Sequence, residues 1–257
     1  MKSGRISIVG AGPGDPELIT LKAVRRIREA DVVLYDRLVS KELLDYAKPD
    51  ARLIYCGKAP GQHTMTQEQI EHEMINHARQ GSKVVRLKGG DPYVFGRGGE
   101  EALAAAKAGI VWEVVPGITS AIGAAAAAGI PLTHRGVAAS FAVITASRCG
   151  DPEAQLDWEH LARGVDTIAV YMGVGRLRQI REELLRHGKS GSTPVALIEN
   201  GTTSRQRTAV GTLDNMEQLA SALEIGNPAM IIIGEVVKVK EVLMKLESAP
   251  DHQSINF

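Results

Sequence analysis

The sequence has few of the features of a secreted or membrane-embedded protein. Its only cysteines are Cys56 and Cys149, too few for a disulfide framework. No apolar run reaches the roughly 18 residues of a membrane-spanning helix. The first residues also carry no signal-peptide hydrophobic segment. We therefore expect a cytoplasmic protein.

The chain also lacks an excess of charge of either sign. Its 30 lysine and arginine residues balance 30 aspartate and glutamate residues. This balance argues against nonspecific electrostatic binding to nucleic acid, because proteins that bind nucleic acid in that way carry an excess of positive charge. An anionic partner would therefore need positive charge that is gathered locally.

Three motifs of common enzyme classes are missing. A glycine-rich segment at 10–14 lies where a dinucleotide fingerprint would, but Asp15 occupies the place of the third glycine. His72, Glu73 and His77 are spaced one residue too far apart for a zinc-binding helix, so no metal site is indicated. The chain contains neither a phosphate-loop pattern nor a Gly-x-Ser-x-Gly elbow.

Strand-like and helix-like segments alternate along the whole chain. We expect strands at 5–9, 31–35, 52–55, 83–87, 111–115, 141–146, 167–172, 195–198 and 230–234. Between them lie helical patterns, such as Thr66 and Gln69 in capping-box spacing before an apolar stripe of Ile70, Met74 and Ala78. The alternation predicts an α/β fold with largely parallel strand pairing.

Pro116-Gly117 is the candidate junction between two domains. We expect an N-terminal α/β domain at 1–116 and a C-terminal α/β domain at 117–247. The last residues, 248–257, show no periodicity and are expected to form a flexible tail.

Two glycine-rich loops follow strands in the first half. One contains glycines 10, 12 and 14, and the other begins at Gly89-Gly90. Glycine lets the backbone come within contact distance of a ligand, and open parallel sheets bind ligands outside the carboxyl ends of their strands. Because the phosphate fingerprints fail, this ligand need not carry phosphate.

Basic side chains gather in the loops expected at strand ends. They are Arg37, Lys58, His63, Lys88, Arg97, His134, Arg135, Arg148, Arg205 and Arg207. Such residues usually lie on solvated loops, but in a chain of balanced charge their clustering is also compatible with an anionic ligand.

Several motifs, taken in chain order from about 6 to about 239, resemble those of the tetrapyrrole methylases. They are Gly10-Ala-Gly-Pro-Gly-Asp15, Tyr35-Asp-Arg-Leu-Val39, Gly57-Lys58, Arg86-Leu-Lys-Gly-Gly-Asp-Pro92, Phe95-Gly-Arg-Gly-Gly-Glu-Glu101, Pro116-Gly-Ile-Thr-Ser120, Gly129-Ile-Pro-Leu-Thr-His-Arg135, Tyr171-Met-Gly173 and Glu199-Asn-Gly-Thr202. The resemblance implies two α/β domains with the active site in the cleft between them, in a homodimer.

The same resemblance implies an activity and its reactants. The methyl donor would be S-adenosylmethionine, without a metal, and the acceptor would be uroporphyrinogen III. Two methylations at carbon would give precorrin-2, the branch point toward siroheme and cobalamin. We expect a stand-alone methylase, without the dehydrogenase and ferrochelatase unit of multifunctional relatives.

The resemblance also implies roles for individual residues. Asp36 would accept a proton and Lys58 would donate one. The residues placed around the donor are Pro13, Gly89, Gly90, Asp91, Val94, Thr119, Ser120, Met172 and Gly201. To these we add Arg97, Arg135 and Arg148 as partners of the substrate's eight carboxylates.

Three alternatives stay open. A methylase of a later precorrin is one, although the motifs at 35–39 and 131–135 argue against it. An NAD-dependent dehydrogenase would fit the α/β pattern but requires the glycine that Asp15 replaces. A non-catalytic module would bind S-adenosylmethionine without turnover.

Overall fold

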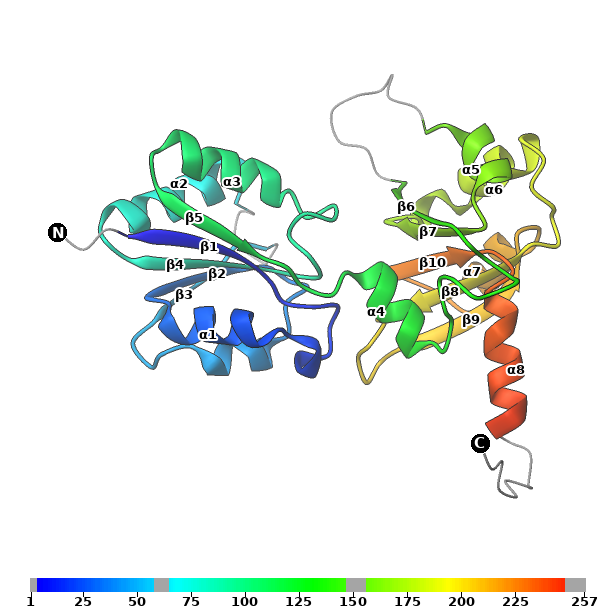
Figure 1. Cartoon of the computed structure of the whole chain (residues 1–257), viewed down its shortest axis with the longest axis horizontal. Coiled ribbons are helices and arrows are strands. Elements are labelled where there is room, and N and C mark those ends of the chain that lie inside the picture. The colour runs from blue at the N-terminus through cyan, green and yellow to red at the C-terminus, as the bar shows by residue number, and fades with distance from the viewer. Residues whose placement is uncertain (1–3, 58–64, 147–155, 248–257) are drawn as a thin grey trace. The chain divides into compact units, whose positions relative to one another are not determined.

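The computed structural model describes residues 4–57, 65–146 and 156–247 of the 257-residue chain. These residues divide into two compact units, one ending at Ser120 and the other beginning at Ala121. Each unit contains a five-stranded sheet flanked by helices (Figure 1). The predicted α/β fold is confirmed. The junction expected at Pro116-Gly117 falls within the first unit, and the expected tail lies outside the described residues.

The sheet of the first unit is parallel throughout, in the order β3-β2-β4-β1-β5. Its strands are β1 (Arg5–Gly10), β2 (Val32–Tyr35), β3 (Arg52–Tyr55), β4 (Lys83–Lys88) and β5 (Val111–Val115). β1 and β4 are neighbours at the centre of the sheet. After β1 the chain continues to β2, on one side of this pair, and after β4 it continues to β5, on the other side. Open parallel sheets bind ligands at such a topological switch point, outside the carboxyl ends of the strands.

Helices cover both faces of the first sheet (Figure 1). They are η1 (Pro16–Leu18), α1 (Leu21–Glu29), η2 (Lys41–Tyr46), α2 (Gln67–Arg79) and α3 (Gly98–Lys107). On one face, Leu34 belongs to a buried cluster with Met74 of α2 and Ala105 of α3. On the other, Val33 clusters with Ile27 of α1. Alternate residues of each strand therefore enter different cores, as the twofold repeat of a strand requires.

The predicted start of α2 is confirmed. The Thr66 hydroxyl accepts the Gln69 backbone N–H at 3.2 Å, and the Gln69 side chain accepts the Thr66 N–H at 2.8 Å. The stripe of Ile70, Met74 and Ala78 is buried, as expected. This reciprocal bonding satisfies two of the donors that a helix N-terminus leaves unpaired.

The second unit has the sheet order β6-β7-β10-β8-β9. Its strands are β6 (Phe141–Thr145), β7 (Thr167–Tyr171), β8 (Pro194–Glu199), β9 (Arg207–Thr212) and β10 (Ala229–Ile233). Its helices are α4 (Ser120–Ala127, which starts at the unit boundary), α5 (Trp158–Gly164), η3 (Val174–Arg176), α6 (Leu177–Arg186), α7 (Met216–Ala222) and α8 (Val237–Glu247). One buried cluster joins α5, α6 and α7 to the sheet, and another joins α4 and the start of α8 to it.

The prediction of largely parallel pairing is wrong for this second sheet. Only β6 and β7 run parallel, whereas β10 is antiparallel to β7 and β8, and β8 is antiparallel to β9. The loop 200–206 joins β8 directly to β9, and a parallel pair would instead need a crossover of a dozen or more residues. β9 was not predicted as a strand, because its sequence mixes polar residues and glycine with few apolar ones.

Of the helices in the described part of the chain, none combines the length and the apolar character that crossing a membrane requires.

Candidate active site

The two glycine-rich loops meet at the switch point of the first sheet. The Gly12 N–H donates to the Gly90 carbonyl at 3.2 Å, and the Gly90 N–H donates to the Gly12 carbonyl at 2.7 Å. The Ala11 N–H bonds the Lys88 carbonyl at 2.8 Å, which extends the pairing of β1 and β4 by one step. The two glycine-rich loops, which we expected to approach the same ligand, are therefore joined by backbone hydrogen bonds into one element, called here the bridged loops.

Two glycines of this element, Gly10 and Gly90, are needed for different reasons. A Cβ on Gly10 would lie 2.5 Å from the Gly117 nitrogen, so Gly10 is needed for backbone packing. Gly90 has φ of +69°, which L side chains rarely adopt, but a Cβ there would meet nothing closer than 3.8 Å, at Thr119 and Ser120. An added Cβ at Gly90 would therefore make ordinary van der Waals contact with Thr119 and Ser120 without a clash, so it is the φ angle that calls for glycine here.

Asp91 fastens this element to the start of the next segment. Its Oδ1 accepts the Tyr93 N–H at 2.8 Å, and its Oδ2 accepts the Gly117 N–H at 3.0 Å. Both carboxylate oxygens are therefore engaged by backbone donors. This geometry indicates that Asp91 shapes the loop that was assigned to the donor.

Residues with positive φ gather in the loops that the sequence singled out. The non-glycine residues of this kind in the described chain are Phe95, Arg97, Met172, Asn200, Thr202 and Glu224. All but Glu224 lie in a motif that carries the family resemblance. Such conformations cost of order 1–3 kcal/mol each and concentrate at functional sites.

The residues proposed for the donor fall on both units. Pro13, Gly89, Gly90, Asp91, Val94, Thr119 and Ser120 lie in the first unit, around the bridged loops. Met172 and Gly201 lie in the second, after β7 and β8, respectively. Met172 is 48% exposed with φ of +54°. A Cβ on Gly201 would lie 2.5 Å from the Ala124 Cβ, so this glycine lets its loop pack on α4.

Asp36 follows β2, at the same edge of the sheet as the bridged loops. Its Oδ1 accepts the Leu38 N–H at 3.1 Å, and its Oδ2 lies 3.4 Å from Nη2 of Arg86. The Asp36 side chain is 30% exposed, so solvent or a ligand can reach it. Its proposed partner Lys58 lies outside the described residues.

A buried charge cluster lies behind Asp36, and the sequence reasoning missed it. Arg86, Lys88 and Glu101 are all at least 95% buried. Glu101 Oε1 accepts from Nε of Arg86 at 3.0 Å, from Nζ of Lys88 at 2.9 Å and from the Gln67 amide at 3.4 Å. The sequence of β4 could have revealed this cluster. Arg86 and Lys88 are two positions apart, so their side chains lie on the same face of the strand. Two buried cations on one face require a buried carboxylate as counter-charge.

The charges in this cluster depend on one another. Burial alone would lower the pKa of Arg86, but the Glu101 and Asp36 carboxylates raise it above its usual value. Burial, together with the positive charge of Arg86, lowers the pKa of Lys88. The carboxylate of Glu101 is therefore what allows two cations to share one buried face.

The basic residues proposed for the substrate have different surroundings. Arg97 makes a bidentate ion pair with Glu100, with N···O distances of 2.9 and 2.6 Å, and both side chains are more than half exposed. Arg135 is exposed in the loop before β6. Arg148 lies outside the described residues. Two other candidates already have partners, since Lys88 is buried against Glu101 and Arg207 bonds Glu199 at 2.6 Å.

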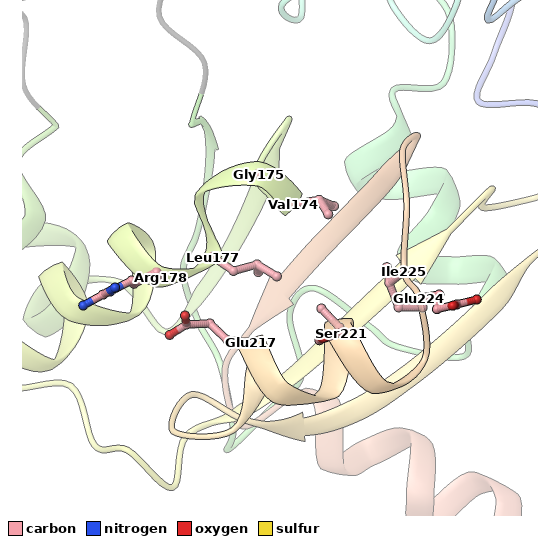
Figure 2. A pocket seen from close by; sticks show the side chains of 9 residues that line it. Val174, Gly175, Leu177, Arg178, Glu217, Ser221, Glu224 and Ile225 are labelled. Atoms are coloured by element: carbon pink, nitrogen blue, oxygen red, sulfur yellow. The ribbon is translucent and has the colours of Figure 1, made fainter.

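A surface pocket in the second unit contains none of the proposed residues. It has a volume of about 460 Å³ and lies beside α6 and α7 (Figure 2). Its lining includes Val174, Leu177, Arg178, Glu217, Ser221 and Ile225. Within the described ranges, no group of three or more His, Cys, Asp or Glu side chains is placed to hold a metal ion.

Comparison with known proteins identifies the family of this chain. The family model described as Tetrapyrrole (Corrin/Porphyrin) Methylases matches residues 5–217. The uroporphyrinogen-III C-methyltransferase of Priestia megaterium is 55% identical over 234 residues, which cover 91% of this chain and 98% of that protein. The siroheme synthase of Edwardsiella ictaluri (strain 93-146) is 49% identical over 240 residues, which cover 93% of this chain and 51% of that protein.

A solved structure shares the fold. It is that of uroporphyrin-III C-methyl transferase from Thermus thermophilus complexed with S-adenyl homocysteine, with a TM-score of 0.78 and 43% identity. The match covers 91% of this chain and 94% of that one. With a family model matched over most of its length and relatives of about 50% identity, the chain belongs to the tetrapyrrole methylases.

Proposed function

We propose that this protein is an S-adenosylmethionine-dependent C-methyltransferase that methylates uroporphyrinogen III twice to give precorrin-2. The observation that carries this proposal is the 55% identity, over nearly the full length of both chains, to a protein named for that activity. We further propose that it acts as a homodimer in the cytoplasm and serves siroheme or cobalamin biosynthesis.

The bridged loops fit a donor of this kind. S-adenosylmethionine has no phosphate, and the loops lack the third glycine and the lysine by which nucleotide sites hold phosphates. Because Gly90 has no side chain, it would let such a ligand come into contact with its backbone. The structure in which the Thermus thermophilus relative holds S-adenyl homocysteine supports the same class of ligand.

We propose that Pro13, Gly89, Gly90, Val94, Thr119 and Ser120 hold the donor from the first unit, while Asp91 shapes the loop that presents them. Met172 and Gly201 would contribute from the second unit. When bound, the donor supplies an electrophilic methyl group on a sulfonium. Methyl transfer is an in-line displacement, so the main task of these residues is to align donor and acceptor.

The remaining chemistry is proton transfer. A pyrrole carbon forms the new C–C bond as the C–S bond breaks, which leaves a positive charge on the macrocycle. Loss of a proton neutralises that charge, and Asp36 is placed at the carboxyl edge of the sheet with an accessible carboxylate that would accept it. Lys58 would donate a proton to one atom of the macrocycle as another macrocycle proton is lost, a tautomerisation, so that each methylation still releases one proton net.

The acceptor's carboxylates would be bound by arginines. We propose Arg97, Arg135 and Arg148 for this role, because guanidinium groups bind carboxylates in bidentate pairs. Arg97 already adopts such a pair with Glu100, and a substrate carboxylate would replace Glu100 in it.

The test is anaerobic incubation of the protein with uroporphyrinogen III and S-adenosylmethionine, followed by mass spectrometry of the tetrapyrrole. The proposal expects a product with two added methyl groups. Donor binding without any methylated product would refute it.

A further inference from the structure

Glu101 holds the buried cations of β4 through one oxygen. Its Oε1 accepts from Arg86, Lys88 and Gln67, whereas its Oε2 is buried with no hydrogen-bond partner among the described residues. Leaving a carboxylate oxygen unpaired in the interior is costly. A buried ion pair is also weak evidence for stability, since apolar residues of similar volume often serve as well. Packing alone therefore does not account for this arrangement.

The guanidinium of Arg86 joins this cluster to Asp36. Its Nε donates to Glu101 at 3.0 Å, its Nη1 donates to the Leu87 carbonyl at 3.2 Å, and its Nη2 points to Asp36 Oδ2 at 3.4 Å. The group is planar, so fixing Nε and Nη1 also fixes the direction of Nη2. Glu101 and the backbone of β4 thus determine where Arg86 meets Asp36.

Asp36 is held at both of its oxygens. The Leu38 N–H fixes Oδ1 and the Arg86 Nη2 fixes Oδ2, while the side chain stays 30% exposed. Arg86 and Glu101 are buried and do not face solvent. Of these three residues, Asp36 is therefore the one that a bound substrate could contact.

We propose that Glu101 and Arg86 are positioning residues, which orient the Asp36 carboxylate for proton transfer. This inference rests on the proposed function, in which Asp36 accepts a proton. Through Glu101 and then Arg86, the start of α3 would thus influence the geometry of Asp36, which follows β2.

The same unit contains a control cluster of similar composition, although Glu113 is 26% exposed and Glu101 is fully buried. Glu113 on β5 also serves an arginine, a lysine and a neutral donor, namely Arg26, Lys22 and Ser7. None of these residues is a proposed site residue. Glu113→Gln therefore removes the same charge from a similar cluster without disturbing Asp36.

The test compares Glu101→Gln, Arg86→Lys and Glu113→Gln in the full-length enzyme. We expect Glu101→Gln and Arg86→Lys each to lower kcat about tenfold, with the acceptor KM and the donor Kd within about twofold of wild type. Glu113→Gln should keep kcat within about twofold of wild type, even if it lowers the unfolding temperature as much as Glu101→Gln does. Wild-type kcat in Glu101→Gln would overturn the proposal.

Arg86→Lys separates geometry from charge. Lysine retains the positive charge but lacks the planar fork, so full activity in this variant would mean that charge alone suffices and would overturn the proposal. Adding Glu101→Gln to Asp36→Asn should lower kcat by less than about twofold further, because both changes act through one carboxylate. Full additivity of the two losses would contradict that.

A crystal structure of the Glu101→Gln variant, solved beside the wild type, gives a readout that does not depend on turnover. The proposal expects Arg86 Nη2 and Asp36 Oδ2 to separate beyond hydrogen-bond distance. Unchanged positions of both groups would overturn it, whether or not the wild type methylates uroporphyrinogen III. The proposed function itself is tested by a different measurement. It fails if the wild-type protein yields no methylated product.

Discussion

Gly12 and Gly90 exchange two backbone hydrogen bonds, of 3.2 and 2.7 Å, across the carboxyl ends of β1 and β4. These strands send the chain in opposite directions, so the bridge lies at the topological switch point of the first sheet. The bridge joins two loops that are more than seventy positions apart in the sequence. We propose that this bridged element binds a phosphate-free methyl donor.

Gly90 gives the first prediction. Its φ of +69° makes valine there strained, and the branched side chain would lie against Thr119 and Ser120, where we propose that the donor binds. We expect Gly90→Val to weaken donor binding more than about tenfold in calorimetric titration and to lower stability by about 1–2 kcal/mol.

Gly109 provides the matched control. It has the same φ of +69°, in the same unit, with no neighbouring atom within 4 Å of an added Cβ. Gly109→Val should lose similar stability but keep the donor Kd within about twofold. Equal donor affinity in the two variants would mean that the space beside Gly90 does not hold the donor.

Gly117 tests the packing of the bridged element. A Cβ there would lie 2.3 Å from the Gly90 carbonyl oxygen and 2.9 Å from the Gly10 Cα, both of them backbone atoms. We expect Gly117→Ala to lower the free energy of unfolding by about 2–3 kcal/mol in urea denaturation. Gly99→Ala, in a helix and with no atom within 4 Å, should be neutral or stabilise by up to about 1 kcal/mol. A Gly117→Ala variant as stable as wild type would refute the packing argument.

Local patterns predicted much of this fold. The capping box of α2, the five strands of the first sheet and the two glycine-rich loops depend on short-range sequence signals, and the structure contains each of them. The pairing of β9 and the direction of β10 depend instead on contacts between distant segments. For that reason the second sheet was wrongly expected to be largely parallel.

The candidate site shows the same contrast between residues found from local motifs and contacts that depend on distant segments. Asp36 was nominated because it belongs to a recognisable motif, whereas Glu101 lies fifteen positions beyond Arg86 and gave no sign of contacting it. Only the packing of α3 on the sheet brings their side chains together. Asp91 was assigned to the donor from its motif, and its two backbone hydrogen bonds became apparent only in three dimensions.

Asp36 and Lys58 give a prediction about turnover. If they transfer protons after methyl transfer, then Asp36→Ala and Lys58→Ala should lower kcat by about 100-fold or more. The donor Kd should stay within about twofold, because neither residue is proposed to hold the donor. Single-turnover rates and calorimetric affinities would be measured together. A loss confined to donor affinity would instead mean that both residues bind the donor and do not transfer protons.

Glu113 gives a prediction about pH. The hydrogen bond from Arg26 is the main reason that the pKa of Glu113 is lowered from 4.5 to about 2. A carboxylate whose pKa is depressed by folding stabilises the protein above its unfolded pKa, and this contribution is lost as the pH falls through the folded pKa. We expect wild type to exceed Glu113→Gln in stability by about 1–2 kcal/mol near neutral pH, allowing for solvent screening.

Urea denaturation of wild type and Glu113→Gln at several pH values checks this. The stability difference should shrink between about pH 4.5 and pH 2, where Glu113 becomes protonated. A difference that stays constant over that range would show that Glu113 does not titrate as its contacts with Arg26 and Lys22 require.

One experiment tests the proposed donor site through the product and the rate of its formation. Wild type and Gly90→Val would be incubated anaerobically with uroporphyrinogen III and S-adenosylmethionine at a donor concentration near the wild-type Kd. We expect a doubly methylated tetrapyrrole from wild type and a rate reduced more than about fivefold in Gly90→Val, restored by excess donor. A wild type that produces no methylated tetrapyrrole, or a Gly90→Val variant with the wild-type rate, would contradict it.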